Sequence, residues 1–359
     1  MPLKMESVRI DKTFAFAVFV LVIIGVIFVY SSSYYQAMRR GEESTYYLVG
    51  HLQRLLFAML FFVLGLVIPY EIIKKIILPL FLLLVMLLVV TLIMGKVQFG
   101  ARRSLPLASF GLQISEFVRI WIVFFFANFF TSHPRIASTG QGMAVTILIS
   151  LFLIFLVAIQ PSLSVALISF LTLLAMLVYG GAKLKRFFSM IAVGVVVFAI
   201  FVIFFPHAHA RIASFLSHPT YQVQQSLIAI GSGGLFGRGP GAGIQKFLFL
   251  PRIHNDFIFA HIAEEFGFFG SLVIFVFFWE IFLRGISIAQ GLQDEYPRLL
   301  VYGLNATIFI IFLVHVGVSL GLLPPTGIPL PFISYGGWSL AANLFAVGLV
   351  LQISRESVR

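Results

Sequence analysis

A single acidic residue, Asp256, stands at the end of a long glycine-rich stretch and directly before an apolar run. It follows His254 and Asn255 and is the only Asp or Glu between residues 206 and 256. A carboxylate at such a junction can take a proton from a substrate hydroxyl as a general base. An Asp just before a helical run is also a preferred helix N-cap. Both interpretations stay open, and a carboxylate committed to capping is the weaker base.

Glycines crowd the stretch before Asp256, with seven between residues 231 and 243. Closely spaced glycines let the backbone approach a ligand and offer N–H groups to phosphate oxygens. The cations Arg238, Lys246 and Arg252 lie among or after them. No strand pattern precedes the run and Lys246 is not followed by Ser or Thr, which excludes a P-loop. The stretch is either a mobile, solvated loop or a cradle for an anionic ligand.

Two further groups of ionisable residues lie inside apolar runs. His261, Glu264 and Glu265 are spaced so that the histidine neighbours both carboxylates on one helix, and Glu116 and Arg119 share a face three residues apart. Ionisable groups at membrane depth face the bundle interior and need partners. We interpret Glu116 and Arg119 as a structural ion pair or the lining of a polar cavity. The His261 group supports the catalytic region or, less specifically, holds a divalent metal; the metal requirement stays open.

The composition places these residues in a membrane protein. Of 359 residues, 60% are hydrophobic and 10% charged, with 42 Phe and no Cys, whereas soluble domains carry roughly 25% charged residues. The absence of Cys excludes disulfides, thiolate metal sites and cysteine nucleophiles. The net charge is +11. Most Lys and Arg residues lie in short loops between apolar runs, so we interpret them as setting the membrane topology rather than as binding nucleic acid.

The elements that must position these residues are apolar runs of about 20 residues, each long enough to cross a bilayer. We expect a single all-α polytopic membrane domain over residues 1–359, with about ten transmembrane helices and a large extracytoplasmic loop over 206–256. The loop keeps apolar residues among its glycines, so we expect ordered or re-entrant structure. The first apolar run, residues 14–30, is longer than the apolar core of a signal peptide, which has at most about 15 residues, so we interpret it as a transmembrane helix. The Lys and Arg distribution predicts that both termini are cytoplasmic. The spans are expected near 14–30, 48–68, 76–95, 114–130, 143–159, 163–180, 187–205, 257–283, 301–322 and 332–353.

Prolines and glycines interrupt the apolar run at residues 321–337, which reads GLLPPTGIPLPFISYGG. Broken backbone at membrane depth is tolerated only where protein or a water-filled cavity surrounds it. This segment is therefore a second candidate wall of the site.

The motifs together resemble the SEDS family (shape, elongation, division and sporulation proteins), in its RodA-type, rod-shape-determining branch. The resemblance covers the whole chain. It rests on Ser115, Glu116 and Arg119, on QP at 160–161, AIGSGG at 229–234, Gln245 and Lys246, LP at 250–251, His254, DFIFA at 256–260, EEFG at 264–267 and the 321–337 segment. Ser104, Ser162, Ile244, Arg252 and Asn255 depart from the family's usual residues.

The resemblance implies a peptidoglycan glycosyltransferase of the bacterial cytoplasmic membrane. Such an enzyme polymerises lipid II into β-1,4 strands at the outer face, inverts the anomeric carbon and releases undecaprenyl pyrophosphate during elongation and cell-shape maintenance. Asp256 then falls on the family's essential aspartate. Arg238, Lys246, Arg252, Gln245 and Ser334 become candidate substrate-binding residues, with a divalent cation (Mg²⁺ or Mn²⁺) as a candidate cofactor.

The implied partners are a class B penicillin-binding protein and other membrane proteins of the elongation complex, with no nucleic acid. Two alternatives stay open. The chain could be a lipid II flippase, or it could be a scaffold for the transpeptidase. The sequence does not distinguish donor from acceptor sites, nor identify the helices that contact the partner.

Overall fold

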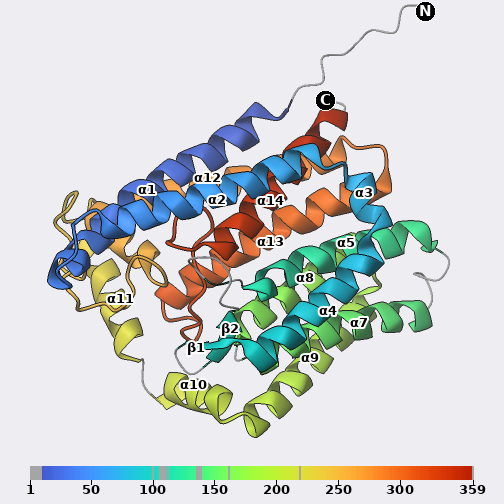
Figure 1. Cartoon of the computed structure of the whole chain (residues 1–359), viewed down its shortest axis with the longest axis horizontal. Coiled ribbons are helices and arrows are strands. Elements are labelled where there is room, and N and C mark those ends of the chain that lie inside the picture. The colour runs from blue at the N-terminus through green and yellow to red at the C-terminus, as the bar shows by residue number, and fades with distance from the viewer. Residues whose placement is uncertain are drawn as a thin grey trace, which may run out of the picture.

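The structure is a computed structural model, and it describes residues 10–98, 101–104, 111, 113–134, 140–160, 162–217 and 220–357. Pro161, part of one of the family motifs, lies outside these residues. The chain is almost entirely helical, as its apolar runs predict (Figure 1). The elements are α1 (Lys12–Arg39), α2 (Tyr46–Val67), α3 (Tyr70–Lys75), α4 (Ile77–Met94), β1 (Lys96–Gln98), β2 (Ala101–Ser104), η1 (Ile114–Phe117), α5 (Val118–Ser132), α7 (Gly140–Ile159), α8 (Leu163–Tyr179), α9 (Leu184–Phe204), α10 (Pro206–Ser217), α11 (Tyr221–Gly233), α12 (Ile258–Gln290), α13 (Glu295–Ser319), α14 (Trp338–Ile353) and η2 (Ser354–Glu356).

The helices form two groups that α13 joins. In one group α14 packs along α2, while α12 packs on α1 and α13; in the other, α8 packs on α5 and α7, and α13 contacts both α5 and α8 (Figure 1). Small residues allow the closest approach. A Cβ on Gly65 would lie 2.4 Å from the carbonyl oxygen of Phe345, and one on Gly348 would lie 2.3 Å from that of Phe62. Such backbone contact is the usual way in which helices pack in lipid.

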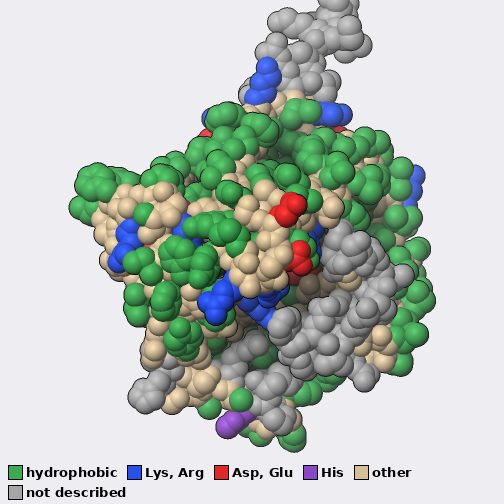
Figure 2. Space-filling view, turned by 60° about the vertical axis from the view of Figure 1, so that its left-hand side comes forward, with side chains coloured by type: hydrophobic (Ala, Val, Ile, Leu, Met, Phe, Trp, Pro, Cys, Tyr) green, Lys and Arg blue, Asp and Glu red, His purple; other side chains and the backbone are tan. Residues whose placement is uncertain are grey.

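In the part of the chain that the structure describes, eight helices are long and apolar enough to cross a membrane, and two shorter helices, Ala144–Ile159 and Leu163–Tyr179, are also apolar. Each predicted span falls on one of these ten segments. The chain is therefore a multi-pass membrane protein, while the number of ten crossings stays a prediction. Hydrophobic side chains cover much of the surface turned forward in Figure 2. Many large hydrophobic side chains of α2, α4 and α9 are exposed, as lipid contact requires.

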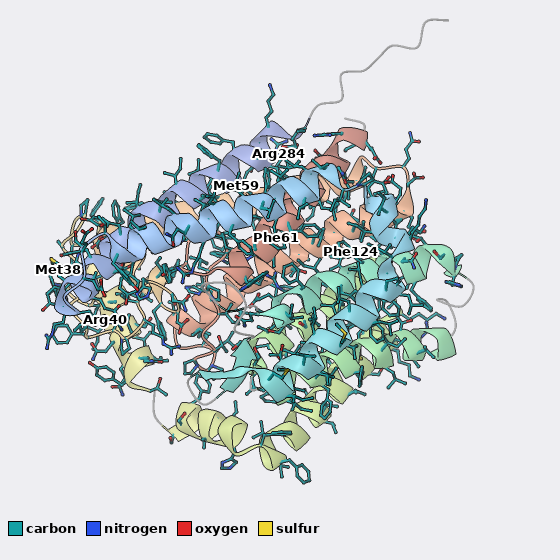
Figure 3. All side chains as sticks on the ribbon, in the orientation of Figure 1. Met38, Arg40, Met59, Phe61, Phe124 and Arg284 are labelled. Carbon is teal, nitrogen blue, oxygen red and sulfur yellow. The ribbon has the colours of Figure 1, made fainter. Side chains whose placement is uncertain are left out.

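The two ends of the described chain meet at one end of the molecule. The backbone N–H of Asp11 donates to Ser354 Oγ (3.2 Å), and the Tyr70 hydroxyl donates to Glu356 Oε2 (2.8 Å). Arg284 lies at this end, while Met38 and Arg40 lie at the opposite end, near α11 (Figure 3). The long connection before α12 is thus remote from the termini.

Three connections differ from simple loops. The 206–256 stretch contains α10 and α11, which agrees with the expectation of ordered structure there. Strands β1 and β2, at residues 96–98 and 101–104, pair antiparallel, which the hydropathy pattern does not reveal. The last predicted span begins later than expected: α14 starts at Trp338, because the prolines and glycines before it keep residues 320–337 out of helix.

Candidate active site

A cavity of about 240 Å³ lies where four segments meet beside Ile311 of α13, and Asp256, Glu116 and Arg252 line it together. The segments are η1 with the residues before it, the start of α8, the stretch before α12, and the non-helical 320–337 stretch with the start of α14. The remaining lining residues are Gly111, Gln113, Ser162, Ser164, Val165, Ile168, Asn255, Ile311, Gly327, Ile328, Pro329, Tyr335, Gly336, Gly337, Trp338 and Ser339.

Asp256 does not cap the helix that follows it. Helix α12 begins at Ile258, its N-cap is Phe257, and no side chain makes a capping hydrogen bond there. The capping interpretation is therefore wrong. The Asp256 side chain is about 10% exposed, and its Oδ2 lies 3.6 Å from Arg252 Nη1. A largely buried carboxylate that faces a cavity beside a cation is placed to act on a bound ligand.

The backbone around Asp256 is fixed by a tight turn and by the 320–337 stretch. Arg252 has φ 54°, and its carbonyl accepts the Asp256 backbone N–H at 3.0 Å. The Ser334 hydroxyl donates to the Asn255 carbonyl (2.7 Å) and accepts the Leu330 N–H (2.8 Å). Ser334 is thus committed to holding the backbone beside Asp256, and it does not line the cavity.

Glu116 brings a second carboxylate to the cavity. Its Oε2 lies 3.3 Å from Arg119 Nη2, and Arg119 Nη1 donates to Asn343 Oδ1 on α14 at 2.9 Å. All three side chains are buried. The pair therefore links α5 to α14 and at the same time makes one wall of the cavity polar.

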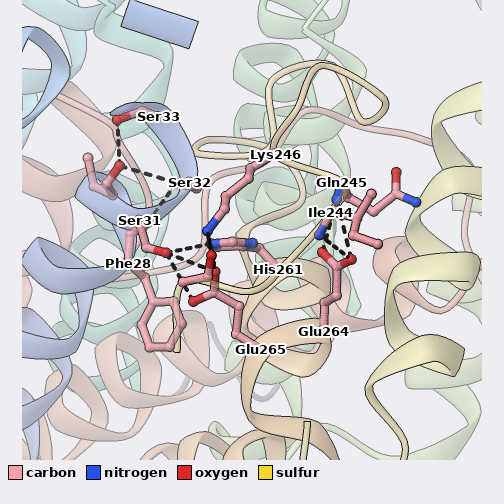
Figure 4. Close-up of polar contacts among 12 residues, drawn as sticks. Phe28, Ser31, Ser32, Ser33, Ile244, Gln245, Lys246, His261, Glu264 and Glu265 are labelled. Carbon is pink, nitrogen blue, oxygen red and sulfur yellow. Dashed lines mark hydrogen bonds and ion pairs between the residues drawn. The ribbon is translucent and has the colours of Figure 1, made fainter. Parts of the chain in front are cut away.

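Lys246 lies in a different buried cluster, which Figure 4 shows. Its Nζ is 2.8 Å from Glu265 Oε1 and also donates to the Gly241 carbonyl. The Ser31 hydroxyl of α1 donates to both Glu265 oxygens at 3.0 Å, and His261 Nε2 lies 3.4 Å from Oε1. Lys246 and Glu265 are almost inaccessible. The assignment of Lys246 to substrate therefore does not fit this structure, because the ammonium is already used to fasten the loop to α1 and α12.

Glu264 is also occupied by the loop. Its carboxylate accepts the backbone N–H of Ile244 (2.8 Å) and of Gln245 (3.3 and 3.2 Å), and all of these contacts lie away from the cavity (Figure 4). Gln245 likewise does not line the cavity. Within the described residues no group of three His, Asp or Glu is arranged to hold a metal ion. In this part of the chain the contacts of Glu264 and Glu265 join the loop to α1 and α12.

The glycine run packs into a break in α12 and does not form an open cradle. Gly267 has φ 65° inside α12, and the N–H groups of Arg238 and Gly239 donate to the Glu264 and Glu265 carbonyls at 3.0 Å. Across the break the N–H of Phe268 donates to the Gly234 carbonyl at 2.9 Å. A Cβ on Gly237 would lie 2.2 Å from the Glu265 carbonyl oxygen. The N–H groups of Arg238 and Gly239 are therefore not available to an anion, because they donate to carbonyls of α12, and that of Gly237 donates to the Gly233 carbonyl.

Arg238 itself is exposed and donates from Nε to Ser232 Oγ at 3.1 Å, away from the cavity. The cavity residue Ser164 had no sequence signal, because it sits among apolar residues of a span. Arg54 of α2, which the sequence also did not single out, stacks 4.1 Å from the centre of the ring of the cavity residue Tyr335. Burial lowers the pKa of His254 to about 4, with Arg40, Arg252 and Arg54 acting in the same direction. Basic side chains thus gather around the turn that carries Asp256, and Lys and Arg are seen near the middle of the face in Figure 2.

A family model described as "Cell cycle protein", whose label combines FtsW, RodA and SpoVE, matches residues 12–359. The chain is 38% identical over 273 residues to stage V sporulation protein E of Bacillus subtilis, which covers 74% of each chain. It is 32% identical to the probable peptidoglycan glycosyltransferase FtsW of Legionella pneumophila, over 97% of this chain and 91% of that protein. The chain therefore belongs to the SEDS family that its motifs resemble.

Solved structures share the fold. One match is a chain of a structure titled "Structural coordination of polymerization and crosslinking by a peptidoglycan synthase complex". It superposes with a TM-score of 0.80 at 24% identity, and the match covers 97% of this chain and 98% of that one. The rod shape determining protein RodA of Thermus thermophilus superposes with a TM-score of 0.74 at 23% identity, covering 100% of both chains. The RodA-like arrangement of helices is thus established at the level of the fold.

Proposed function

We propose that the chain is a peptidoglycan glycosyltransferase that polymerises lipid II. The observation that carries the proposal is the placement of Asp256, a nearly buried carboxylate beside Arg252, on a cavity that Glu116 also lines. Family membership and the activity in the name of the Legionella relative support it.

In this mechanism Asp256 takes the proton from the 4-hydroxyl of the acceptor sugar. The hydroxyl oxygen forms a bond to the anomeric carbon of the donor while the bond from that carbon to the pyrophosphate oxygen breaks. The pyrophosphate leaves with the bonding electrons and its lipid, and the single displacement inverts an α-linked donor to a β-1,4 link. Arg252 stabilises negative charge that develops on the leaving group. A second carboxylic acid is not needed, because pyrophosphate leaves without protonation.

The size of the cavity implies that the site must widen. Its volume of about 240 Å³ is below the roughly 300–1,000 Å³ of ordinary ligand pockets, and polymerisation needs two lipid-linked sugars. We propose that a class B penicillin-binding protein, together with other membrane proteins of the elongation complex, binds this chain and favours the open form. The solved synthase complex, whose title joins polymerization to crosslinking, supports such a partner.

The proposed location is the bacterial cytoplasmic membrane, with both termini cytoplasmic and the site on the outer face. The meeting of the termini at one end and the position of α11 at the other support a single polytopic domain with this orientation (Figure 1). Lipid II would then reach the cavity from the outer leaflet, where its polyprenyl tail stays in hydrocarbon.

A divalent cation stays a proposal. Mg²⁺ is usually held by one or two carboxylates together with substrate phosphates, and Asp256 and Glu116 on one cavity suit that donor set. The cation would then neutralise pyrophosphate charge. Loss of polymerisation on chelation with EDTA, restored by Mg²⁺ or Mn²⁺, would support it, while full activity in EDTA would exclude it.

We assign the activity to elongation rather than division. The RodA-type motifs support this branch, whereas the curated relatives carry division and sporulation names. Depletion of the chain in its own host separates the two roles. Rounded cells would support elongation, and filaments of undivided rods would contradict it.

Reconstitution with fluorescent lipid II tests the enzyme against the two alternatives. The purified chain, with and without its cognate class B partner, should convert lipid II into long strands that lysozyme digests. A flippase would expose labelled lipid II on the opposite leaflet without changing its size. A scaffold would do neither. With a flippase or a scaffold, no strands would form from the purified chain, and replacing Asp256 would not change that result.

A further inference from the structure

Two carbonyls on either side of Gly327 are held by side chains from different helices. The Ser164 hydroxyl of α8 donates to the Thr326 carbonyl, and His315 Nδ1 of α13 lies 2.7 Å from the Ile328 carbonyl oxygen. Gly327 itself has φ +69°, and a Cβ on it would lie 3.5 Å from Asp256 Oδ2. The backbone that faces the carboxylate is therefore pinned from both sides.

The chemistry of the His315 contact fixes its proton. A carbonyl oxygen only accepts hydrogen bonds, so Nδ1 must carry the hydrogen and donate it. His315 is 1% exposed, and among the described residues its Nε2 has no hydrogen-bond partner. The ring therefore makes one polar contact, with the wall of the cavity. Neither His315 nor Ser164 belongs to a motif that the sequence singles out.

Such a device is required here because the segment has no secondary structure of its own. Residues 320–337 are non-helical, and backbone groups inside a membrane protein must be satisfied by the protein itself. Pro325 and Pro329 on either side carry no N–H. The side chains of Ser164 on α8 and His315 on α13 supply the hydrogen-bond donors that the segment's own backbone lacks.

We propose that His315 and Ser164 are positioning residues that clamp residues 326–328 and so set the gap between Gly327 and the Asp256 carboxylate. The inference rests on the proposed transferase activity. The acceptor hydroxyl must lie within hydrogen-bond reach of Asp256 and in line with the donor carbon. A shift of about 1 Å in such a geometry costs about 100-fold in rate.

The test measures kcat and KM for lipid II polymerisation by the full chain, assayed with its cognate class B partner. His315→Leu should lower kcat about 10- to 100-fold, because the donor is lost and the wall moves, while KM should stay near the wild-type value. His315→Asn should recover most of the activity, since the amide nitrogen of Asn can occupy the position of Nδ1. Ser164→Ala should lower kcat in the same direction.

Thr307→Val and Thr172→Val are the matched controls. These residues lie on the same two helices, are buried and bond to each other at 3.2 Å, but do not line the cavity. Both should keep the wild-type kcat. Melting temperatures of all variants show whether each is folded; if His315→Leu does not fold, Ser164→Ala and His315→Asn decide.

The outcomes are distinct. A wild-type chain that makes no polymer overturns the transferase proposal and the clamp with it. If the wild type is active, a wild-type kcat in His315→Leu or Ser164→Ala overturns the clamp alone. Equal loss in His315→Asn and His315→Leu, or equal loss in the threonine controls, also overturns it, because packing rather than the hydrogen bond would then be responsible.

Discussion

The Oδ2 atom of Asp256 lies 3.6 Å from Nη1 of Arg252, four residues earlier, and both side chains line one cavity. The spacing is that of a helical turn, but the backbone is not helical, since Arg252 has φ 54°. The tight turn therefore brings cation and carboxylate together at the entrance to α12. This arrangement separates Arg252 from the other cations of the loop.

Arg252→Ala should reduce kcat/KM for lipid II about 100-fold, as expected when a charged group that stabilises a leaving group is removed. Arg238→Ala is the control, because its guanidinium is exposed and contacts Ser232 rather than the cavity. It should reduce kcat/KM less than about threefold, since it removes only a surface charge outside the site. Equal losses in the two variants would place the anionic ligand elsewhere on the loop.

Lys246→Met should lower stability by about 3–5 kcal/mol, because Glu265 is left buried without its cation. The double variant Lys246→Met with Glu265→Gln should recover at least about 1 kcal/mol of that loss. Arg284→Met removes the exposed pair with Glu280 and should cost less than about 1 kcal/mol. Urea or thermal unfolding in detergent measures all three. A stable Lys246→Met chain without activity would restore Lys246 as a substrate ligand.

Gly237→Ala and Gly241→Ala separate backbone strain from steric overlap. Both positions have positive φ, +83° and +75°, but only a Cβ on Gly237 meets neighbouring backbone, 2.2 Å from the Glu265 carbonyl oxygen. Gly241→Ala should cost about 1 kcal/mol from conformation alone. Gly237→Ala should cost about 3 kcal/mol or more, because the loop must also leave α12. Similar melting temperatures would show that the loop is not held in the break at Gly267.

His254 should make the fold less stable in acid. Burial lowers its folded-state pKa from 6.5 to about 4, so between these values the unfolded chain binds a proton that the folded chain does not. Stability is therefore full above about pH 6.5 and declines as the pH falls, by roughly 2 kcal/mol at about pH 5. His254→Phe keeps the ring contacts with Tyr47 and Tyr335 and should flatten this decline. An unchanged slope of melting temperature against pH would contradict it.

Much of the fold follows from the sequence, because a bilayer permits few structures and the predicted spans near 14–30, 48–68 and 76–95 need only length and hydropathy. The candidate base could also be singled out, since Asp256 is the sole acidic residue of its loop. The proximity of Glu116 and Arg119 follows from helical spacing.

What the sequence does not contain is the identity of long-range partners. From the sequence, Lys246 and Ser334 look like ligand-binding residues. In the structure Lys246 pairs with Glu265, and Ser334 donates to the carbonyl of Asn255, which lies far from it in the sequence. His315 and Ser164 are hidden in apolar spans because one polar residue hardly changes hydropathy. The break in α12 at Gly267 could not be predicted either, because a single glycine in an apolar run does not show that a distant segment packs against the helix there.

The most direct test of the account is polymerisation of labelled lipid II by Asp256→Asn, a variant that keeps the size of the side chain but cannot accept the proton. The matched control is Asp294→Asn, an exposed acid just before α13 and away from the cavity. Asp256→Asn should form no glycan strands while melting like the wild type and retaining its class B partner, and Asp294→Asn should be fully active. Strands of normal length from folded Asp256→Asn would contradict the assignment of the general base.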